Sequence, residues 1–108
     1  MSPTDILFLY ITCPTKDLAV LLSERAIQDK LAACANIHGP MTSVYPWVGA
    51  IQHDTEWVLI LKTNHTQVDA LTSLIESEHP YQIPCILQMP IAGGNLPYLK
   101  WLQDQMAD

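Results

Sequence analysis

The feature that most constrains this chain is a pair of β-prone segments that together span residues 31–62. The second of them, residues 55–62, contains a nearly continuous apolar run. Such a run is typical of a strand that is covered on both faces. We expect the two segments to form one β-hairpin, longer than the core of a small domain requires. Its far end therefore needs a covering surface that the rest of the chain does not supply.

The predicted hairpin has two irregular points. Gly39 and Pro40 lie inside its first arm, and because proline cannot donate a hydrogen bond to a neighbouring strand, we expect a bend or bulge there. The turn is predicted between Gly49 and Thr55. This position would leave residues 52–54 exposed at or near the tip.

The other segments alternate between strand and helix patterns. Residues 5–12 form an apolar β-prone run that predicts a central strand, and residues 16–31 contain no Gly or Pro and carry an apolar stripe at helical spacing. Residues 65–77 predict a second helix with a clean apolar stripe. Residues 83–91 predict a strand, which its two prolines place at an edge of the sheet or at a terminal position.

Polar residues mark where the predicted helices begin. Thr15 is expected to cap the first helix. Asn64, with Gln67 three residues later, is a variant of the capping box and is expected to cap the second. Asn95 followed by Pro97 is typical of the start of a third, short helix near the end of the chain.

The predicted order is β-α-β-β-α-β followed by a short C-terminal helix. This order defines an α+β fold, the ferredoxin-like sandwich, in which two helices cover one face of a four-stranded antiparallel sheet. Residues 1–108 are expected to form a single domain. The second face of the sheet would then be open and apolar.

The composition indicates how that open face is covered. Hydrophobic residues make up 49% of the chain and charged residues only 15%, against a typical charged share of about 25%. Because a small monomer with so few charges lacks polar surface, we expect copies of the chain to associate. The three cysteines, Cys13, Cys34 and Cys85, are too few to suggest a disulfide framework and are expected to be free thiols.

The charge excludes some partners. The formal net charge is −6, and the five Lys and Arg residues are scattered. Nucleic acid needs clusters of basic residues, so we predict no nucleic-acid partner and, for the same reason, no anionic membrane surface. No apolar run approaches the ~20 residues of a transmembrane helix. The beginning of the chain also lacks the features of a signal peptide, so we expect a cytoplasmic protein.

Motifs for catalysis are absent from the sequence. There is no Gly-x-Ser-x-Gly pattern, no cysteine has a neighbouring histidine, and the glycine-rich residues 92–95 lack the lysine of a phosphate-binding loop. We therefore predict that the protein is not an enzyme and requires no cofactor. Soft sulfur and imidazole donors remain, and these suit copper or zinc.

A metal site would have to be assembled by the fold, because no short-range pair such as Cys-x2-Cys is present. His79 is the preferred ligand because it lies in a loop, and Cys13 is expected to end the first strand. His79 also opens the segment 79–84, in which two prolines flank Tyr81 and fix an extended loop. This loop is interpreted either as a stiff connector or as the lip of a cleft between subunits.

Five blocks of sequence resemble the CutA family of divalent-cation tolerance proteins, in the order of that family and along nearly the whole chain. The blocks are residues 30–37 (KLAACANI), 43–49 (SVYPWVG), 61–63 (LKT), 79–84 (HPYQIP) and 96–102 (LPYLKWL). The resemblance implies a homotrimer of ferredoxin-like subunits, similar to the PII signalling proteins, in which long hairpins pair with neighbouring subunits. It also implies binding of divalent metal ions such as copper, and no established enzymatic reaction.

The resemblance implies a set of metal ligands as well. His79 matches the loop histidine of the family, Cys34 matches its Ala-Ala-Cys, and metal-binding members have a thiol near the end of the first strand, the neighbourhood of Cys13. Gln82 and Cys85 stand where members of the family often have glutamate. Two potential carboxylate ligands are therefore replaced in this chain.

An alternative function follows from the likeness to PII proteins. In this hypothesis the trimer is a sensor that binds a small anionic metabolite in the cleft between subunits. The residues expected to line that cleft are Tyr81, Lys62 and Trp101.

Overall fold

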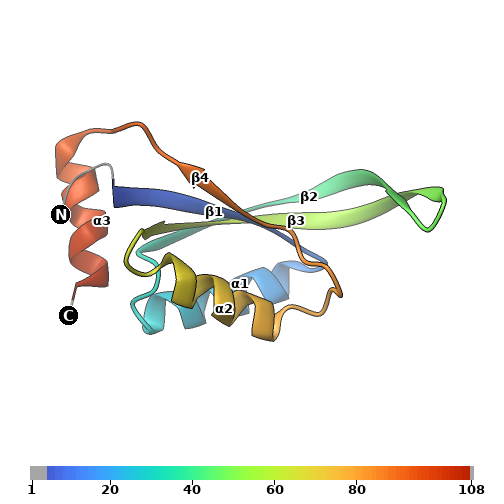
Figure 1. The fold of residues 1–108 in the computed structure, drawn as a ribbon, viewed down its shortest axis with the longest axis horizontal. Helices are drawn as coiled ribbons and strands as arrows, with labels where there is room; N and C mark the ends of the chain where they lie inside the picture. The colour runs from blue at the N-terminus through green and yellow to red at the C-terminus, as the bar shows by residue number, and fades with distance from the viewer. Residues whose placement is uncertain (1–4, 108) are drawn as a thin grey trace.

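A four-stranded antiparallel sheet with helices on one face forms the body of the molecule in the computed structural model, which describes residues 5–107 (Figure 1). The elements are β1 (Ile6–Cys13), α1 (Lys16–Gln28), β2 (Cys34–Trp47), β3 (Ala50–Asn64), α2 (Val68–Glu78), β4 (Ile86–Pro90) and α3 (Leu96–Met106). The strand order β2-β3-β1-β4 is that of the ferredoxin-like sandwich. The predicted α+β class and element order are therefore confirmed. Residues 1–4 and 108 of the predicted domain lie outside the described residues.

The main core lies between the sheet and the two helices α1 and α2. Leu9 and Ile11 of β1 pair in register with Leu61 and Leu59 of β3, and all four side chains are fully buried. The helices add further buried side chains at helical spacing: Ala19, Leu22 and Ala26 from α1, and Val68, Leu71 and Ile75 from α2. The apolar runs predicted as central strands are β1 and β3. Each of them has a neighbouring strand on both sides in the sheet.

The first helix begins where the sequence predicts. The side-chain oxygen of Thr15 accepts a hydrogen bond from the N–H of Leu18 over 3.1 Å, as expected of an N-cap. The helix ends at Gln28, earlier than the predicted residue 31. It stops there because Lys30 adopts a left-handed conformation with φ of 59°, which closes the last turn.

The caps predicted for the other two helices are only partly present. Oδ1 of Asn64 accepts the N–H of Gln67 over 2.9 Å, but this bond closes a turn ahead of α2, which begins at Val68. Asn95 occupies the N-cap position of α3 without a capping bond from its side chain, and Pro97 lies in the first turn as expected.

The turn of the hairpin lies earlier in the chain than predicted. Trp47 pairs with Ala50, so Val48 and Gly49 are the only two turn residues. Both have left-handed backbones, with φ of 50° and 77°, as in the two-residue turns that match the twist of a hairpin. The prediction of a turn between Gly49 and Thr55 is wrong, because residues 52–54 belong to β3.

The predicted bulge of the hairpin is confirmed. The register between β2 and β3 shifts between His38 and Met41, which are the residues flanking Gly39 and Pro40. A side chain at position 39 would meet the ring of Trp57, since a Cβ atom there would lie 2.8 Å from two ring carbons. A glycine is therefore needed where the two strands and the indole come together.

The last strand is shorter than predicted and lies at an edge of the sheet. β4 contains only Ile86–Pro90 of the predicted residues 83–91 and pairs with β1 alone. Pro84 lies before the strand, and Pro90 is its last residue and pairs with Leu7, which agrees with the rule that proline within a sheet is confined to edge strands. Residues 79–85 consequently form a loop that leads from α2 to β4.

The third helix closes the opposite end of the sheet from the hairpin tip (Figure 1). A second core cluster lies beneath it and consists of Ile6, Ala33, Leu99, Leu102 and Met106. The amide of Asn64 donates to Oε1 of Gln103 over 3.0 Å, and both side chains are buried. This bond ties α3 to the end of β3.

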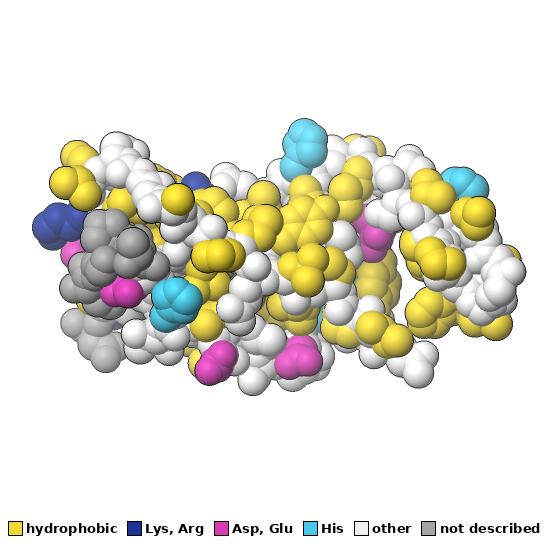
Figure 2. Space-filling view, turned by 45° about the horizontal axis from the view of Figure 1, so that its top comes forward, with side chains coloured by type: hydrophobic (Ala, Val, Ile, Leu, Met, Phe, Trp, Pro, Cys, Tyr) yellow, Lys and Arg dark blue, Asp and Glu magenta, His cyan; other side chains and the backbone are white. Residues whose placement is uncertain are grey.

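Beyond the helices, both faces of the hairpin are uncovered in the chain, which measures 46 × 25 × 21 Å. Figure 2 shows hydrophobic side chains on the open side of the sheet and along the hairpin on the right. Exposed apolar residues there include Val44, Trp47, Val48 and Ile51, with Val48 90% exposed. The predicted need for an additional covering surface therefore applies to this end.

Across residues 5–107, every helix is too short or too polar to span a membrane.

Candidate functional site

A cavity of about 430 Å³ lies between the far half of the hairpin and the loop that follows α2. The residues that give it its character are Tyr45, Trp47, Asp54, Glu56, Tyr81 and Ile83. Figure 2 shows this region as a hollow between the body and the hairpin end, with hydrophobic side chains on both sides.

The strand register brings the hairpin residues of the cavity to one face. After the bulge, Met41 of β2 pairs with Glu56 of β3, and Ser43 pairs with Asp54. Because alternate residues of a strand point to the same side, Tyr45 lies on the face that carries both carboxylates. This is the open face of the sheet, opposite α1 and α2.

Glu56 is the most buried acid of the cavity, with 7% of its surface exposed. Its Oε2 accepts a hydrogen bond from the hydroxyl of Tyr81 over 2.8 Å. Burial and this bond raise the pKa of Tyr81 well above its usual value. The phenol therefore stays protonated and remains a donor across the neutral range.

A second phenol and carboxylate pair lies further along the hairpin. Tyr45 donates its hydroxyl to Oδ2 of Asp54, and this hydrogen bond is the main reason that the pKa of Tyr45 is raised. The cavity thus contains two carboxylates, each of which accepts a hydrogen bond from a tyrosine.

The two thiols nearest this region are poor metal ligands in their present state. Burial is the main cause that raises the pKa of Cys13 to about 11, and Cys13 has no exposed surface. Burial also raises the pKa of Cys85, although its hydrogen bond with Thr12 opposes this effect. Because the thiolate is the form that binds metal, coordination by either thiol would first require the loss of a bound proton.

His79 lies directly behind the cavity and is 8% exposed. Its Nδ1 lies 3.2 Å from the backbone N–H of Tyr81, and its Nε2 lies 2.8 Å from the carbonyl oxygen of Thr12. An N–H can only donate and a carbonyl can only accept, so Nδ1 is the acceptor and Nε2 carries the proton. The ring also contacts Tyr81 edge-on, with 4.6 Å between the ring centroids.

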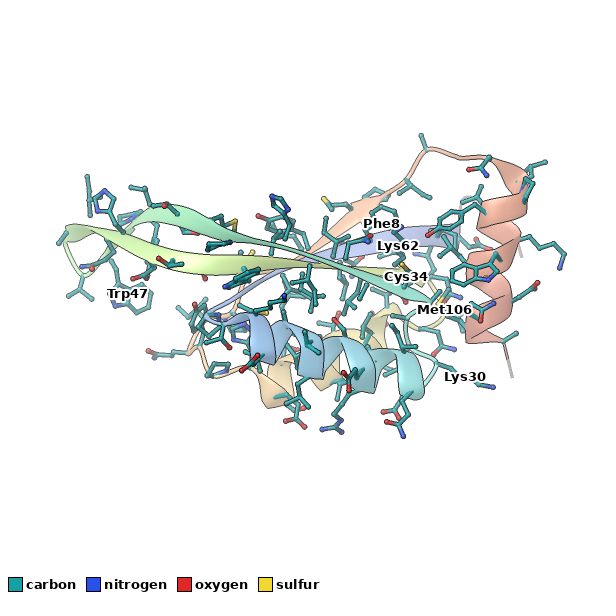
Figure 3. All side chains as sticks on the ribbon, turned by 180° about the vertical axis from the view of Figure 1, so that it is seen from behind. Phe8, Lys30, Cys34, Trp47, Lys62 and Met106 are labelled. Atoms are coloured by element: carbon teal, nitrogen blue, oxygen red, sulfur yellow. The ribbon has the colours of Figure 1, made fainter. Side chains whose placement is uncertain are left out.

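The three predicted metal ligands do not form one site within the subunit. Cys13 pairs with Trp57 on the helix-covered face of the sheet. Cys34 pairs with Lys62 on the open face, and Figure 3 shows it near α3, far from Trp47 at the hairpin tip. Among residues 5–107, no group of three or more His, Cys, Asp or Glu side chains is arranged to hold a metal ion.

The residues predicted to bind an anionic metabolite are likewise divided within one subunit. Lys62 donates to the hydroxyl of Tyr98 over 2.9 Å, and Trp101 stacks on Tyr98. Tyr81 instead contacts Glu56, which lies six residues from Lys62 along β3, a separation of about 20 Å. A single copy of the chain therefore does not bring these three residues together into the cleft that the alternative hypothesis requires.

Glu56 and Tyr45 were not predicted as functional residues from the sequence. In the sequence, Glu56 is typical of an ordinary polar position in a strand. The available signal was its location beside Trp57 at the start of an apolar run, where a charged side chain is unlike its neighbours. Its burial could not be derived, because the covering Tyr81 comes from a loop 25 residues away.

The strand order, the two helices on one face and the oversized hairpin define a ferredoxin-like α+β protein with an acidic and aromatic pocket. A family model described as "CutA1 divalent ion tolerance protein" matches residues 7–105 of this chain. The chain therefore belongs to the CutA1 divalent ion tolerance family, and the resemblance drawn from its five sequence blocks is confirmed.

Curated relatives support this membership. The "Protein CutA homolog" of Xenopus laevis is 42% identical over 95 residues, which cover 88% of this chain and 63% of that protein. "Protein CutA 1, chloroplastic" of Oryza sativa subsp. japonica is 44% identical over 96 residues, covering 89% of this chain and 54% of that protein. This chain thus spans between about half and two thirds of these two relatives. The "Divalent-cation tolerance protein CutA" of Thermus thermophilus is 37% identical, and the match covers 87% of this chain and 91% of that protein.

Solved structures have the same fold over nearly the whole chain. The divalent ion tolerance protein CutA1 of Ehrlichia chaffeensis superposes with a TM-score of 0.93 at 37% identity, covering 99% of this chain and 100% of that one. CutA1 of Oryza sativa gives a TM-score of 0.92 at 41% identity, covering 99% of each chain. The long hairpin is therefore shared with experimentally determined members of the family.

Proposed function

We propose that this protein binds divalent cations such as copper, that it takes part in the response to metal ions, and that it acts by binding and not by catalysis. The observation that carries the proposal is membership in a family described by divalent ion tolerance, over residues 7–105. The relative from Thermus thermophilus bears the name of a divalent-cation tolerance protein.

His79 is the ligand that the geometry supports best. Histidines that bind metal commonly donate their second ring N–H to a carbonyl, which fixes the tautomer and leaves the other nitrogen available. The contact of Nε2 with the carbonyl of Thr12 has this form. A metal ion on Nδ1 would displace only the 3.2 Å hydrogen bond from Tyr81. Coordination by neutral imidazole also agrees with the preference of copper for nitrogen donors.

Cys34 is the second candidate metal ligand after His79, and Cys13 is the third. Cys34 is half-buried on the open face of the sheet, whereas Cys13 is fully buried and has a pKa of about 11. Cys13 and Cys34 lie on opposite faces of the sheet, and residues 5–107 contain no group of three or more such donors, so each ligand would need further ligands from water or from a second subunit. We infer weak binding at separate positions of each subunit.

We also propose that residues 1–108 act as a single domain that assembles into a homotrimer in the cytoplasm. The uncovered apolar residues of the hairpin support assembly, and an obligate interface would bury more than about 2,000 Å². Three free cysteines support a reducing compartment. Sedimentation should give about three times the subunit mass of 12.1 kDa, and a monomer mass would contradict the assembly.

Copper titration by calorimetry tests the metal site. The assembled protein is compared with His79→Gln and with His65→Gln, whose histidine is exposed ahead of α2. We expect His79→Gln to weaken copper binding at least tenfold and His65→Gln to leave it unchanged. Equal binding by all three proteins would contradict the assignment of His79.

A further inference from the structure

Both ring nitrogens of His79 are occupied in the folded chain. Nε2 contacts the carbonyl oxygen of Thr12 over 2.8 Å, and Nδ1 accepts the backbone N–H of Tyr81 over 3.2 Å. Because Nε2 carries the proton, Nδ1 holds the one lone pair of the ring that is able to bind a metal ion. The backbone of Tyr81 therefore covers the coordinating atom of His79.

The imidazole is anchored more firmly than the segment that covers it. The backbone N–H of His79 donates to the carbonyl oxygen of Ile75 over 2.9 Å, in the last turn of α2. Within residues 5–107, by contrast, residues 80–83 form no backbone–backbone hydrogen bond. Pro80 is exposed, so the outer side of this segment is open in the single chain. Access to Nδ1 thus depends on movement of residues 80–83 and not on movement of the histidine.

The side chain of Tyr81 fastens this segment to the hairpin. Its hydroxyl donates to Oε2 of Glu56 over 2.8 Å, and its ring contacts the imidazole of His79 edge-on. The acceptor is a carboxylate that is 7% exposed, and such a bond is stronger than one between neutral groups in water. In the described part of the chain, the two bonds of Tyr81 are the hydrogen bonds that hold residues 80–83.

We propose that Tyr81 is a cap over the free nitrogen of His79 and that its hydrogen bond to Glu56 keeps this cap closed. Because Glu56 belongs to β3, the bond couples the position of the hairpin to the access of a metal ion to His79. Only the open fraction of the protein binds metal, so the closed cap lowers the apparent affinity. The effect on metal binding rests on the function proposed above, whereas the cap itself is a property of the fold.

Acylation by diethyl pyrocarbonate tests the cap without a metal, because this reagent attacks an imidazole nitrogen whose lone pair is free. The assembled protein is treated at one neutral pH, and mass spectrometry of the digest gives the rates at His79 and at the exposed His65. We expect His79 to react much more slowly than His65 in the native protein. Equal rates at the two histidines would overturn the proposal.

Two variants weaken the bond that closes the cap. Tyr81→Phe removes the donor but keeps the ring and the backbone N–H, and we expect acylation of His79 to be about tenfold faster than in the native protein. Glu56→Gln keeps an oxygen acceptor without the charge, so we expect an increase of about threefold. A native rate at His79 in Tyr81→Phe would overturn the proposal, and a native rate in Glu56→Gln would contradict the role of its carboxylate.

The matched control is Tyr98→Phe, which removes a different tyrosine hydroxyl. That hydroxyl bonds to Lys62 in an exposed contact, so the rate at His79 should stay at its native value. An increase equal to that of Tyr81→Phe would contradict a specific cap.

The dependence on urea separates local opening from general destabilisation. Opening of the cap exposes little surface, so the acylation rate of His79 in Tyr81→Phe, relative to that of His65, should stay constant at urea concentrations below the unfolding transition. A rate that rises with urea in parallel with the unfolded fraction would show that His79 reacts only after global unfolding, and would overturn the cap.

Copper titration by calorimetry separates this inference from the proposed function. We expect Tyr81→Phe to bind copper about tenfold more tightly than the native protein, and the double variant with His79→Gln to lose this gain. Equal copper affinity of the native protein and Tyr81→Phe would contradict the coupling. Faster acylation of His79 in Tyr81→Phe, without copper binding by any variant, would contradict the proposed function and support the cap.

Discussion

The hydroxyl of Tyr81 donates to Oε2 of Glu56 over 2.8 Å and so connects the loop after α2 with β3. These two residues form the junction between the body of the subunit and its projecting hairpin. Because Glu56 is 7% exposed, the bond satisfies a carboxylate that has little access to water. The loop that the sequence marks by two prolines is thus fixed at its aromatic residue as well.

Replacing Tyr81 by Phe should lower the free energy of unfolding by about 1–3 kcal/mol, because it leaves a largely buried carboxylate without its donor. Denaturant unfolding measures this loss. Tyr98→Phe is the matched control, since the hydroxyl of Tyr98 bonds to Lys62 in an exposed contact and should change stability by less than about 0.5 kcal/mol. Equal losses in the two variants would contradict the importance of the bond to Glu56.

Adding a methyl group at Gly39 should destabilise the protein by about 1–3 kcal/mol, the usual range for overpacking. The new Cβ would lie 2.8 Å from two carbons of the Trp57 ring. Gly93→Ala is the control, because no atom lies within 4 Å of a Cβ at that position. A Gly39→Ala protein as stable as the control would show that the indole can move aside.

Replacing Val48 by Asn should stabilise the protein by about 1 kcal/mol. Val48 has φ of 50°, a left-handed conformation that costs a β-branched residue roughly 1–2 kcal/mol, whereas Asn followed by Gly is favoured in this kind of turn. Its side chain is 90% exposed in the subunit, so little packing is lost. Thermal unfolding provides the measurement, and a decrease in stability would indicate that Val48 is covered in the assembly.

The thiol of Cys13 should react slowly with iodoacetamide at pH 8.5. It is fully buried and burial raises its pKa to about 11, so little thiolate is present. Mass spectrometry of the digested protein should show Cys34 alkylated at least tenfold faster, with the two rates becoming similar in denaturant. Equal rates in the folded protein would contradict the burial of Cys13.

The raised pKa of Cys13 also affects the stability of the protein at high pH. The folded state holds the proton of Cys13 more strongly than the unfolded state, whose thiol has the ordinary value of 9.0. The stability gained from the protonated Cys13 thiol is therefore fully present below about pH 9 and is lost as the pH rises through about 11. Unfolding measured between pH 8 and pH 10.5 should show a smaller decrease for Cys13→Ala than for the unmodified protein. An identical decrease would contradict the shift.

Local patterns were sufficient to predict most of the fold. The apolar runs identified β1 and β3, helical spacing identified α1 and α2, and the element order identified the ferredoxin-like sandwich. The errors concern backbone conformations that side-chain type does not reveal. Val48 and Lys30 are unfavourable choices for left-handed positions, so neither the turn of the hairpin nor the end of α1 could be placed from residue preferences.

By itself the sequence determined the element order, the excessive length of the hairpin and the family of the protein, because these depend on periodicity and on motifs that are local in the chain. The tertiary structure alone decided which donors meet. It separated Cys13 from Cys34 by placing them on opposite faces of the sheet, and it engaged both ring nitrogens of His79. It also placed Glu56 beneath Tyr81, and this contact depends on strand register and loop path.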